Sequence, residues 1–138
     1  MTALSSALTF VWLGLVLGIS FIETPLKFRA PGIDVPRALG IGRLVFRALN
    51  TVEIGLAVAL SALLLARDHT SAQAIVLALL VAALASQIGL IRPRLNRRTD
   101  RVLAGEVIER SRLHVGYVVL EVAKAGLLIA FGVLIAQA

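Results

Sequence analysis

Long apolar stretches alternate with short polar and basic ones along the whole chain. A helix needs roughly 20 mostly apolar residues to cross the hydrocarbon core of a bilayer, which is about 30 Å thick. Stretches of that length occur four times, at about 4–24, 41–66, 72–91 and 113–136. The pattern predicts an all-α membrane protein in which residues 1–138 form a single integral membrane domain, with four transmembrane helices in an antiparallel bundle.

Composition supports this prediction and narrows the chemistry. Hydrophobic residues make up 59% of the 138 positions and the mean hydropathy is +0.93, well above the range of ordinary soluble domains. The chain has no cysteine, so disulfides and thiolate metal sites are excluded, and we expect no bound metal and no resident cofactor. No Lys or Arg precedes the first apolar stretch, which is too long for a signal peptide, so we expect a helix there.

Basic residues are concentrated in two of the three connections. Four lie between the first two apolar stretches or at the start of the second, namely Lys27, Arg29, Arg37 and Arg43, and seven arginines lie from Arg92 to Arg112. The middle connection has only Arg67. By the positive-inside rule we expect a multi-pass protein of the bacterial cytoplasmic (inner) membrane with both termini outside. We expect the basic loops to attract anionic headgroups, and we expect no nucleic-acid binding because no separate basic domain exists.

The second basic connection has a pattern of its own. Residues 96–109 are expected to form a short amphipathic helix at the membrane interface. Its lipid-facing residues would be Leu95, Val102, Leu103, Val107 and Ile108.

A shift of 68 residues superposes the two halves of the chain. It places Pro25 on Pro93, Arg29 on Arg97 and Glu53 on Glu121. One hypothesis is a tandem repeat of two hairpins, with both glutamates at the same depth in the membrane. The alternative is chance, since any two apolar hairpins overlay roughly.

Polar side chains follow one face of the last helix and one face of the second. A charge near the centre of a membrane helix costs about 2.5 to 3.5 kcal/mol, so such residues face the protein interior or water. Spacings of three and four residues place on one face His114, Tyr117, Glu121 and Lys124. The same spacings on the second helix join Arg43, Arg47, Asn50 and Glu53, while Glu23 ends the first span and Gln87 lies near the end of the third.

These faces predict a polar cavity in the cytoplasmic half of the bundle. Glu53 and Glu121 would be its proton or cation sites. The other expected ligand-binding or lining residues are Arg47, Asn50, His114, Tyr117, Lys124 and Glu23. The alternative is structural ion pairing, in which Glu121 and Lys124 pair within their helix and Arg47 extends to the interface.

Four segments carry a resemblance to a known family, namely SFIETPLKFRAPGI, GRLVFRALNTVE, LIRPRLNRRTDRVLAG and SRLHVGYVVLEVAK. They resemble the uncharacterised bacterial four-helix membrane proteins related to the vertebrate transmembrane family associated with cisplatin resistance, and more distantly the copper-resistance D proteins. The resemblance covers nearly the whole chain. It implies a four-helix fold and no established activity.

A second resemblance concerns the segment RALNTVE. It is similar to the start of helix two in the membrane-associated eicosanoid and glutathione metabolism proteins, which hold glutathione between the subunits of a trimer. The resemblance implies that Arg47, Asn50 and Glu53 would bind the charged ends of glutathione. Two departures stand against it: the spacing from Arg47 to Asn50 is one residue shorter, and the fourth helix lacks the arginine expected to stabilise a thiolate.

The leading expectation is a small transporter or channel-like protein that binds or passes a small charged solute and forms a homo-oligomer. Whether the chain is an enzyme is left open, with an enzyme less expected. A glutathione-dependent transferase of lipophilic substrates is the first alternative. An accessory subunit of a larger membrane complex is the second.

Overall fold

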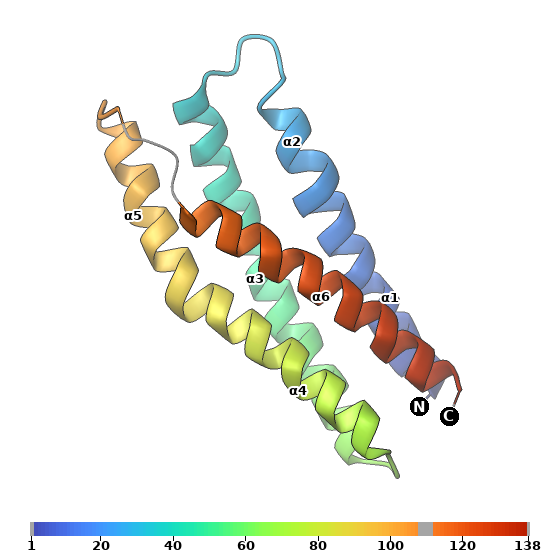
Figure 1. Ribbon diagram of the computed structural model, residues 1–138. Coiled ribbons are helices and arrows are strands. Elements are labelled where there is room, and N and C mark those ends of the chain that lie inside the picture. Colours follow the sequence, from blue (N-terminus) through green and yellow to red (C-terminus); the bar gives the residue numbers. More distant parts are fainter. Residues whose placement is uncertain (1, 108–111, 138) are drawn as a thin grey trace.

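The computed structural model describes residues 2–107 and 112–137, and within those ranges every regular element is helical. The helices of the described residues form four rods, whose arrangement is seen in Figure 1. The first contains α1 (Thr2–Val16), the π-helical segment η1 (Leu17–Glu23) and α2 (Thr24–Lys27). The second is α3 (Val35–Leu65). The third contains α4 (Ser71–Ser86), the π-helical segment η2 (Gln87–Ile91) and α5 (Arg92–Leu103), and the fourth is α6 (Arg112–Ala136).

All four rods are long and apolar enough to cross a membrane, judged by length and composition. The predicted all-α class with four candidate spans is therefore confirmed, but three boundaries differ, the first being the end of the first rod at Lys27 instead of about residue 24. The second helix begins at Val35 because Asp34 caps it, accepting a hydrogen bond from the backbone N–H of Arg37. The third rod continues through the expected loop as far as Leu103.

The expected interfacial helix at residues 96–109 is instead the last part of this third rod. Helix α5 starts at Arg92 and ends at Leu103, followed by a turn in which Gly105 has a φ of +92°. Glycine adopts this left-handed conformation without a steric penalty. Ile108 and Glu109, which belonged to the expected helix, lie outside the described residues.

The two π-helical segments explain how the first and third rods remain helical beyond their prolines. Pro25 and Pro93 each occupy the second position of the short helix that follows a π segment. A proline ring clashes with the carbonyl four residues earlier, and a wider turn relieves this clash. The backbone N–H groups of Thr24 and Arg92 accordingly donate to the carbonyls of Ile19 and Gln87, five residues back. The helices continue past their prolines instead of ending there.

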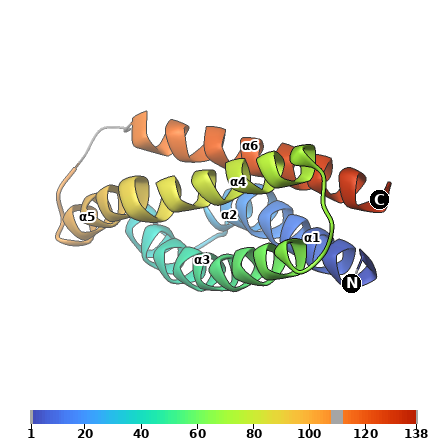
Figure 2. The ribbon, with the colours of Figure 1, turned by 90° about the horizontal axis from the view of Figure 1, so that it is seen from below.

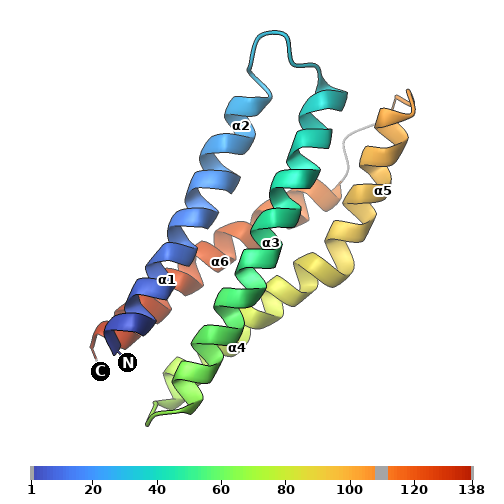
Figure 3. The same ribbon diagram turned by 180° about the vertical axis from the view of Figure 1, so that it is seen from behind.

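Both termini lie at one end of the molecule, together with the connection between α3 and α4 (Figure 1). The opposite end carries the connections that follow α2 and α5 (Figure 1). Helix α6 packs chiefly against α1 and α4, and α3 packs against α1, α4 and α5. Helices α3 and α6 lie on opposite sides, with α6 in front in Figure 1 and α3 in front in Figure 3. Figure 2 shows the same layering from below.

Two apolar clusters leave a polar layer between them. The larger one lies toward the termini and includes Trp12, Leu60, Leu80, Leu128 and Ile135. The smaller one lies toward the basic connections and contains Phe46, Leu49 and Tyr117. Apolar packing on both sides of the polar layer thus restricts the side chains within it.

Candidate functional site

A buried lysine lies between two buried glutamates in the middle layer. The Nζ atom of Lys124 on α6 lies 2.5 Å from Oε2 of Glu53 on α3 and 2.7 Å from Oε1 of Glu121 on α6. Lys124 and Glu53 have no exposed surface, and Glu121 is 2% exposed. We call these three residues the charged triad. Burying an ion pair is costly unless further hydrogen bonds satisfy its charges.

Three neutral side chains supply such hydrogen bonds to the triad. Trp12 Nε1 donates to Oε2 of Glu53 at 2.7 Å. Gln87 Nε2 donates to Oε1 of Glu121 at 2.7 Å, and Ser20 Oγ donates to Oε2 of the same carboxylate at 2.5 Å. Trp12 and Ser20 lie on the first rod and Gln87 on the third. Every rod therefore contributes at least one side chain to the network.

The triad holds more acceptors than its surroundings satisfy. Two carboxylates share one ammonium group, so the fully ionised triad has a formal charge of −1. Among the described residues, Glu53 Oε1 is buried without a hydrogen-bond partner, as are Asn50 Oδ1 and Gln87 Oε1. A proton or another small cation bound here would neutralise the excess charge.

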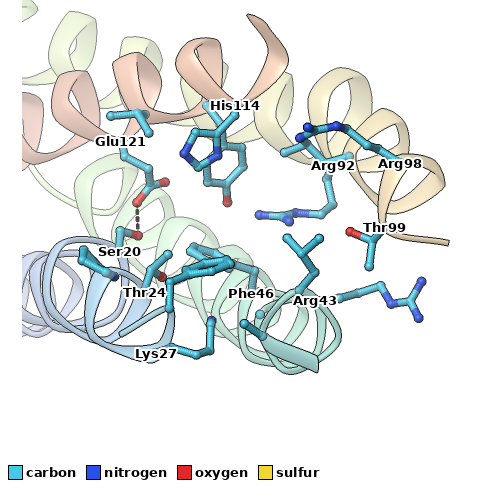
Figure 4. A pocket seen from close by; sticks show the side chains of 18 of the residues that line it. Ser20, Thr24, Lys27, Arg43, Phe46, Arg92, Arg98, Thr99, His114 and Glu121 are labelled. Atoms are coloured by element: carbon cyan, nitrogen blue, oxygen red, sulfur yellow. Dashed lines mark hydrogen bonds between the residues drawn. The ribbon is translucent and has the colours of Figure 1, made fainter. Parts of the chain in front are cut away.

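A cavity of about 410 Å³ lies between the triad and the basic connections. Glu121 and Ser20 form part of its wall, joined by their hydrogen bond (Figure 4). Its basic lining residues are Lys27, Arg43, Arg92, Arg98 and His114. Its apolar lining residues include Phe21, Phe28, Leu39, Phe46, Leu95 and Val118. Cavities of this size with mixed lining are typical of small-molecule sites.

Arg92 extends from the start of α5 into the space between α3 and α6 (Figure 4). Its guanidinium carbon lies 4.5 Å from the ring centroid of Tyr117 and 4.8 Å from that of Phe46. The two rings meet edge to face, with centroids 5.5 Å apart. Both contacts are cation–π interactions, which hold the guanidinium in a fixed orientation.

Two ion pairs lie at the edge of the cavity. Arg43 on α3 pairs with Asp100 on α5. Lys27 on α2 pairs with Glu23 at 3.4 Å, and the Lys27 side chain is only 7% exposed. The first pair connects the second rod to the third, whereas the second pair lies within the first rod. Together they neutralise two of the basic groups in the cavity wall.

The structure brings together most of the residues expected from the sequence. Glu53, Glu121 and Lys124 form the triad, so the alternative pairing of Glu121 with Lys124 is present as well. Tyr117 is buried and lines the cavity, and His114 is exposed at its wall. Asn50 is buried on α3, and Glu23 is engaged by Lys27.

Arg47 lies apart from this group. It is exposed and does not line the cavity, contrary to the expectation. The inward face of α3 carries Phe46, Asn50 and Glu53, and Arg47 follows Phe46 by one residue, which is about 100° of helix rotation. The glutathione resemblance implies that Arg47, Asn50 and Glu53 share one accessible surface. Within one chain, Arg47 does not share such a surface with the other two residues.

Four residues that bind the triad or line the cavity were not predicted from the sequence, namely Trp12, Ser20, Lys27 and Arg92. Trp12 is the only tryptophan of the chain and lies in an apolar helix, which is a weak signal for a buried N–H donor. Ser20 is small enough to be read as a packing residue. Arg92 reads as part of the basic loop, because the sequence does not show that the third helix continues past Pro93.

Across residues 2–107 and 112–137, no group of three or more His, Cys, Asp or Glu side chains could hold a metal ion. The chain was compared with protein-family models, curated proteins and solved structures, and no significant match was found in any of the three.

Proposed function

We propose that this protein is a small transporter or channel-like protein of the bacterial inner membrane, which binds or passes a small charged solute through the cavity. One observation carries the proposal: the Glu121 carboxylate belongs both to the cavity wall and to the charged triad. A solute in the cavity would therefore act directly on the charges at the centre of the bundle.

The triad offers a way to couple such a solute to a proton or cation. Lys124 Nζ contacts both Glu53 and Glu121, so a change at either carboxylate changes the pairing of the other. A proton or cation that engaged Glu121 would shift the lysine toward Glu53. In this mechanism Glu121 takes up the coupled proton or cation at the cavity wall, and Glu53 holds the lysine.

The topology that goes with this proposal is an antiparallel bundle with both termini outside. The basic connections after α2 and α5 would face the cytoplasm, in accord with the positive-inside rule. The cavity, which lies toward these connections, would open to the cytoplasmic side. The proposal includes a homo-oligomer, since apolar side chains are exposed along each rod and would face lipid or a second copy.

The proposal also includes a tandem repeat of two hairpins. Segment η1 ends at Glu23 and η2 ends at Ile91, which are 68 residues apart. The same shift relates Pro25 to Pro93 and Glu53 to Glu121. The two glutamates lie on either side of Lys124, an arrangement that favours the repeat.

Proton flux into liposomes tests the proposal. Encapsulated pyranine would report proton entry driven by a potassium diffusion potential, with and without benzoate or tetraethylammonium outside. We expect flux in the wild type and its loss in Glu121→Gln and in the double variant Glu53→Gln with Glu121→Gln. Glu106→Gln is the control, because Glu106 is exposed, pairs with Arg101 at the surface and does not line the cavity. Wild-type flux in the double variant would refute the proposal.

A further inference from the structure

We propose that the cavity is a site for an organic anion, a carboxylate or phosphate group attached to an apolar body, with Arg92 as the residue that binds the anionic group. The inference rests on the proposed function, in which the cavity is a solute site, and adds the charge and chemical class of the solute.

The charges in the cavity wall favour an anion. Among the described residues, its one acidic lining residue is Glu121, which is already engaged by Lys124, Gln87 and Ser20. Of the basic lining residues, Lys27 pairs with Glu23 and Arg43 pairs with Asp100. In the part of the chain that the structure describes, Arg92 has no carboxylate partner, and its Nε atom is buried without a hydrogen-bond partner.

The position of Arg92 suits recognition of a carboxylate or phosphate. The rings of Phe46 and Tyr117 contact its guanidinium and fix its orientation. A guanidinium presents paired N–H donors at its edge, which match two oxygens of a carboxylate or phosphate. Because the orientation is fixed before binding, little side-chain entropy is lost when an anion arrives. The pair would also be stronger inside the bundle than in water.

The apolar lining indicates the rest of the ligand. Phe21 on the first rod and Phe28, which directly follows that rod, face the same cavity as Leu95 on the third rod and Val118 on the fourth. A small inorganic anion would leave these side chains uncovered, whereas an apolar body would bury them. The same chemistry belongs to the headgroup region of an anionic lipid and to a free organic acid or phosphate ester.

Equilibrium binding to the full chain in nanodiscs of neutral phosphatidylcholine tests the inference. The probe is 11-(dansylamino)undecanoate, whose fluorescence rises in an apolar site, displaced by octanoate, octyl phosphate or octanol. We expect both anions to displace the probe at concentrations at least tenfold lower than octanol, because charge-assisted hydrogen bonds contribute this much or more. Equal displacement by octanol would overturn the inference.

Variants at Arg92 test whether this residue binds the anionic group. We expect Arg92→Gln to weaken probe binding about tenfold or more, and Arg92→Lys, which keeps the charge but loses the paired donors, to weaken it less. Arg94→Gln is the matched control, since Arg94 lies two residues away on α5, is exposed and does not line the cavity. Wild-type affinity in Arg92→Gln would overturn the assignment. If Arg92→Gln does not fold, Arg92→Lys together with the comparison of octanoate and octanol decides.

Nanodiscs containing phosphatidylglycerol distinguish the two sources of the anion. Competition of this lipid with the probe in the wild type, lost in Arg92→Gln, would support the inference and identify the headgroup as the source. Undiminished probe binding would support a free solute. The binding and flux measurements also separate the two proposals. Probe binding without any proton flux would support the anion site and refute the transport function. Proton flux without anion binding would support the transport function and refute the anion site.

Discussion

Lys124 on α6 and Glu53 on α3 form a 2.5 Å salt bridge in which neither side chain has any exposed surface. The two residues are 71 positions apart in the chain. Replacing a buried ion pair by apolar residues is often neutral, but removing one partner leaves a buried charge and costs about 3 to 5 kcal/mol. The pair therefore affects stability strongly and in a way that depends on which residues are changed together.

Lys124→Met is expected to destabilise the protein by about 3 to 5 kcal/mol, because it leaves Glu53 and Glu121 without their shared cation. Unfolding by sodium dodecyl sulfate in mixed micelles measures the loss. The triple variant that adds Glu53→Gln and Glu121→Gln should recover most of it, since no buried charge remains unpaired. A Lys124→Met protein as stable as the wild type would contradict this account of the triad.

Trp12 should report on the state of Glu53, because its indole N–H donates to that carboxylate at 2.7 Å. Since Trp12 is the only tryptophan, the emission spectrum of the whole protein comes from this position. We expect Glu53→Gln to shift the emission maximum and Glu106→Gln to leave it unchanged. Trp12→Phe should lower stability by about 1.5 to 3 kcal/mol, the usual contribution of a hydrogen bond to a charged group. Identical spectra in the wild type and Glu53→Gln would argue against the contact.

Phe46→Leu should weaken binding of the anionic probe roughly two- to fivefold, the effect of losing one cation–π contact to Arg92. Phe21→Leu is the control, because Phe21 lines the same cavity but makes no such contact with the guanidinium. Titration of both variants in neutral nanodiscs measures the difference. An equal loss in the two variants would mean that the rings act only as apolar lining.

Thr70→Ala is expected to cost about 1 kcal/mol of stability, because Thr70 and Gln73 form a reciprocal capping box at the start of α4. The Gln73 side chain also donates to the carbonyl of Leu134, which ties this helix end to α6. Ser71→Ala serves as the comparison, since the neighbouring serine is exposed and does not cap the helix. Unfolding in mixed micelles should separate the two variants, and equal stabilities would show that the cap contributes little.

The sequence predicted what depends on local pattern and missed what depends on packing between helices. The apolar stretches gave the four candidate spans, and the three-residue spacing of Glu121 and Lys124 gave their pairing. No spacing rule places Glu53 against Lys124, since they lie on different helices. Arg47 was assigned to the inward face because polar spacing alone does not show that α3 turns Phe46 inward.

The ends of the first and third helices were also predicted wrongly. The first and third spans were expected to end with their apolar stretches, at about residues 24 and 91, just before Pro25 and Pro93. The wider π turns before them allow both rods to continue, and this brings Lys27 and Arg92 to the cavity. A single sequence does not show whether a proline will be bypassed in this way, because neighbouring helices decide it.

The distribution of the charged triad also bears on how the protein is made. Glu53 belongs to α3, which is synthesised before α6, the helix that carries its counter-charge, Lys124. Until α6 is complete, the growing chain carries a carboxylate in the middle of an apolar segment with no cation to balance it, at a cost of about 2.5 to 3.5 kcal/mol. The arrival of α6 removes that cost, so the fourth helix is the one that completes the charge balance of the bundle.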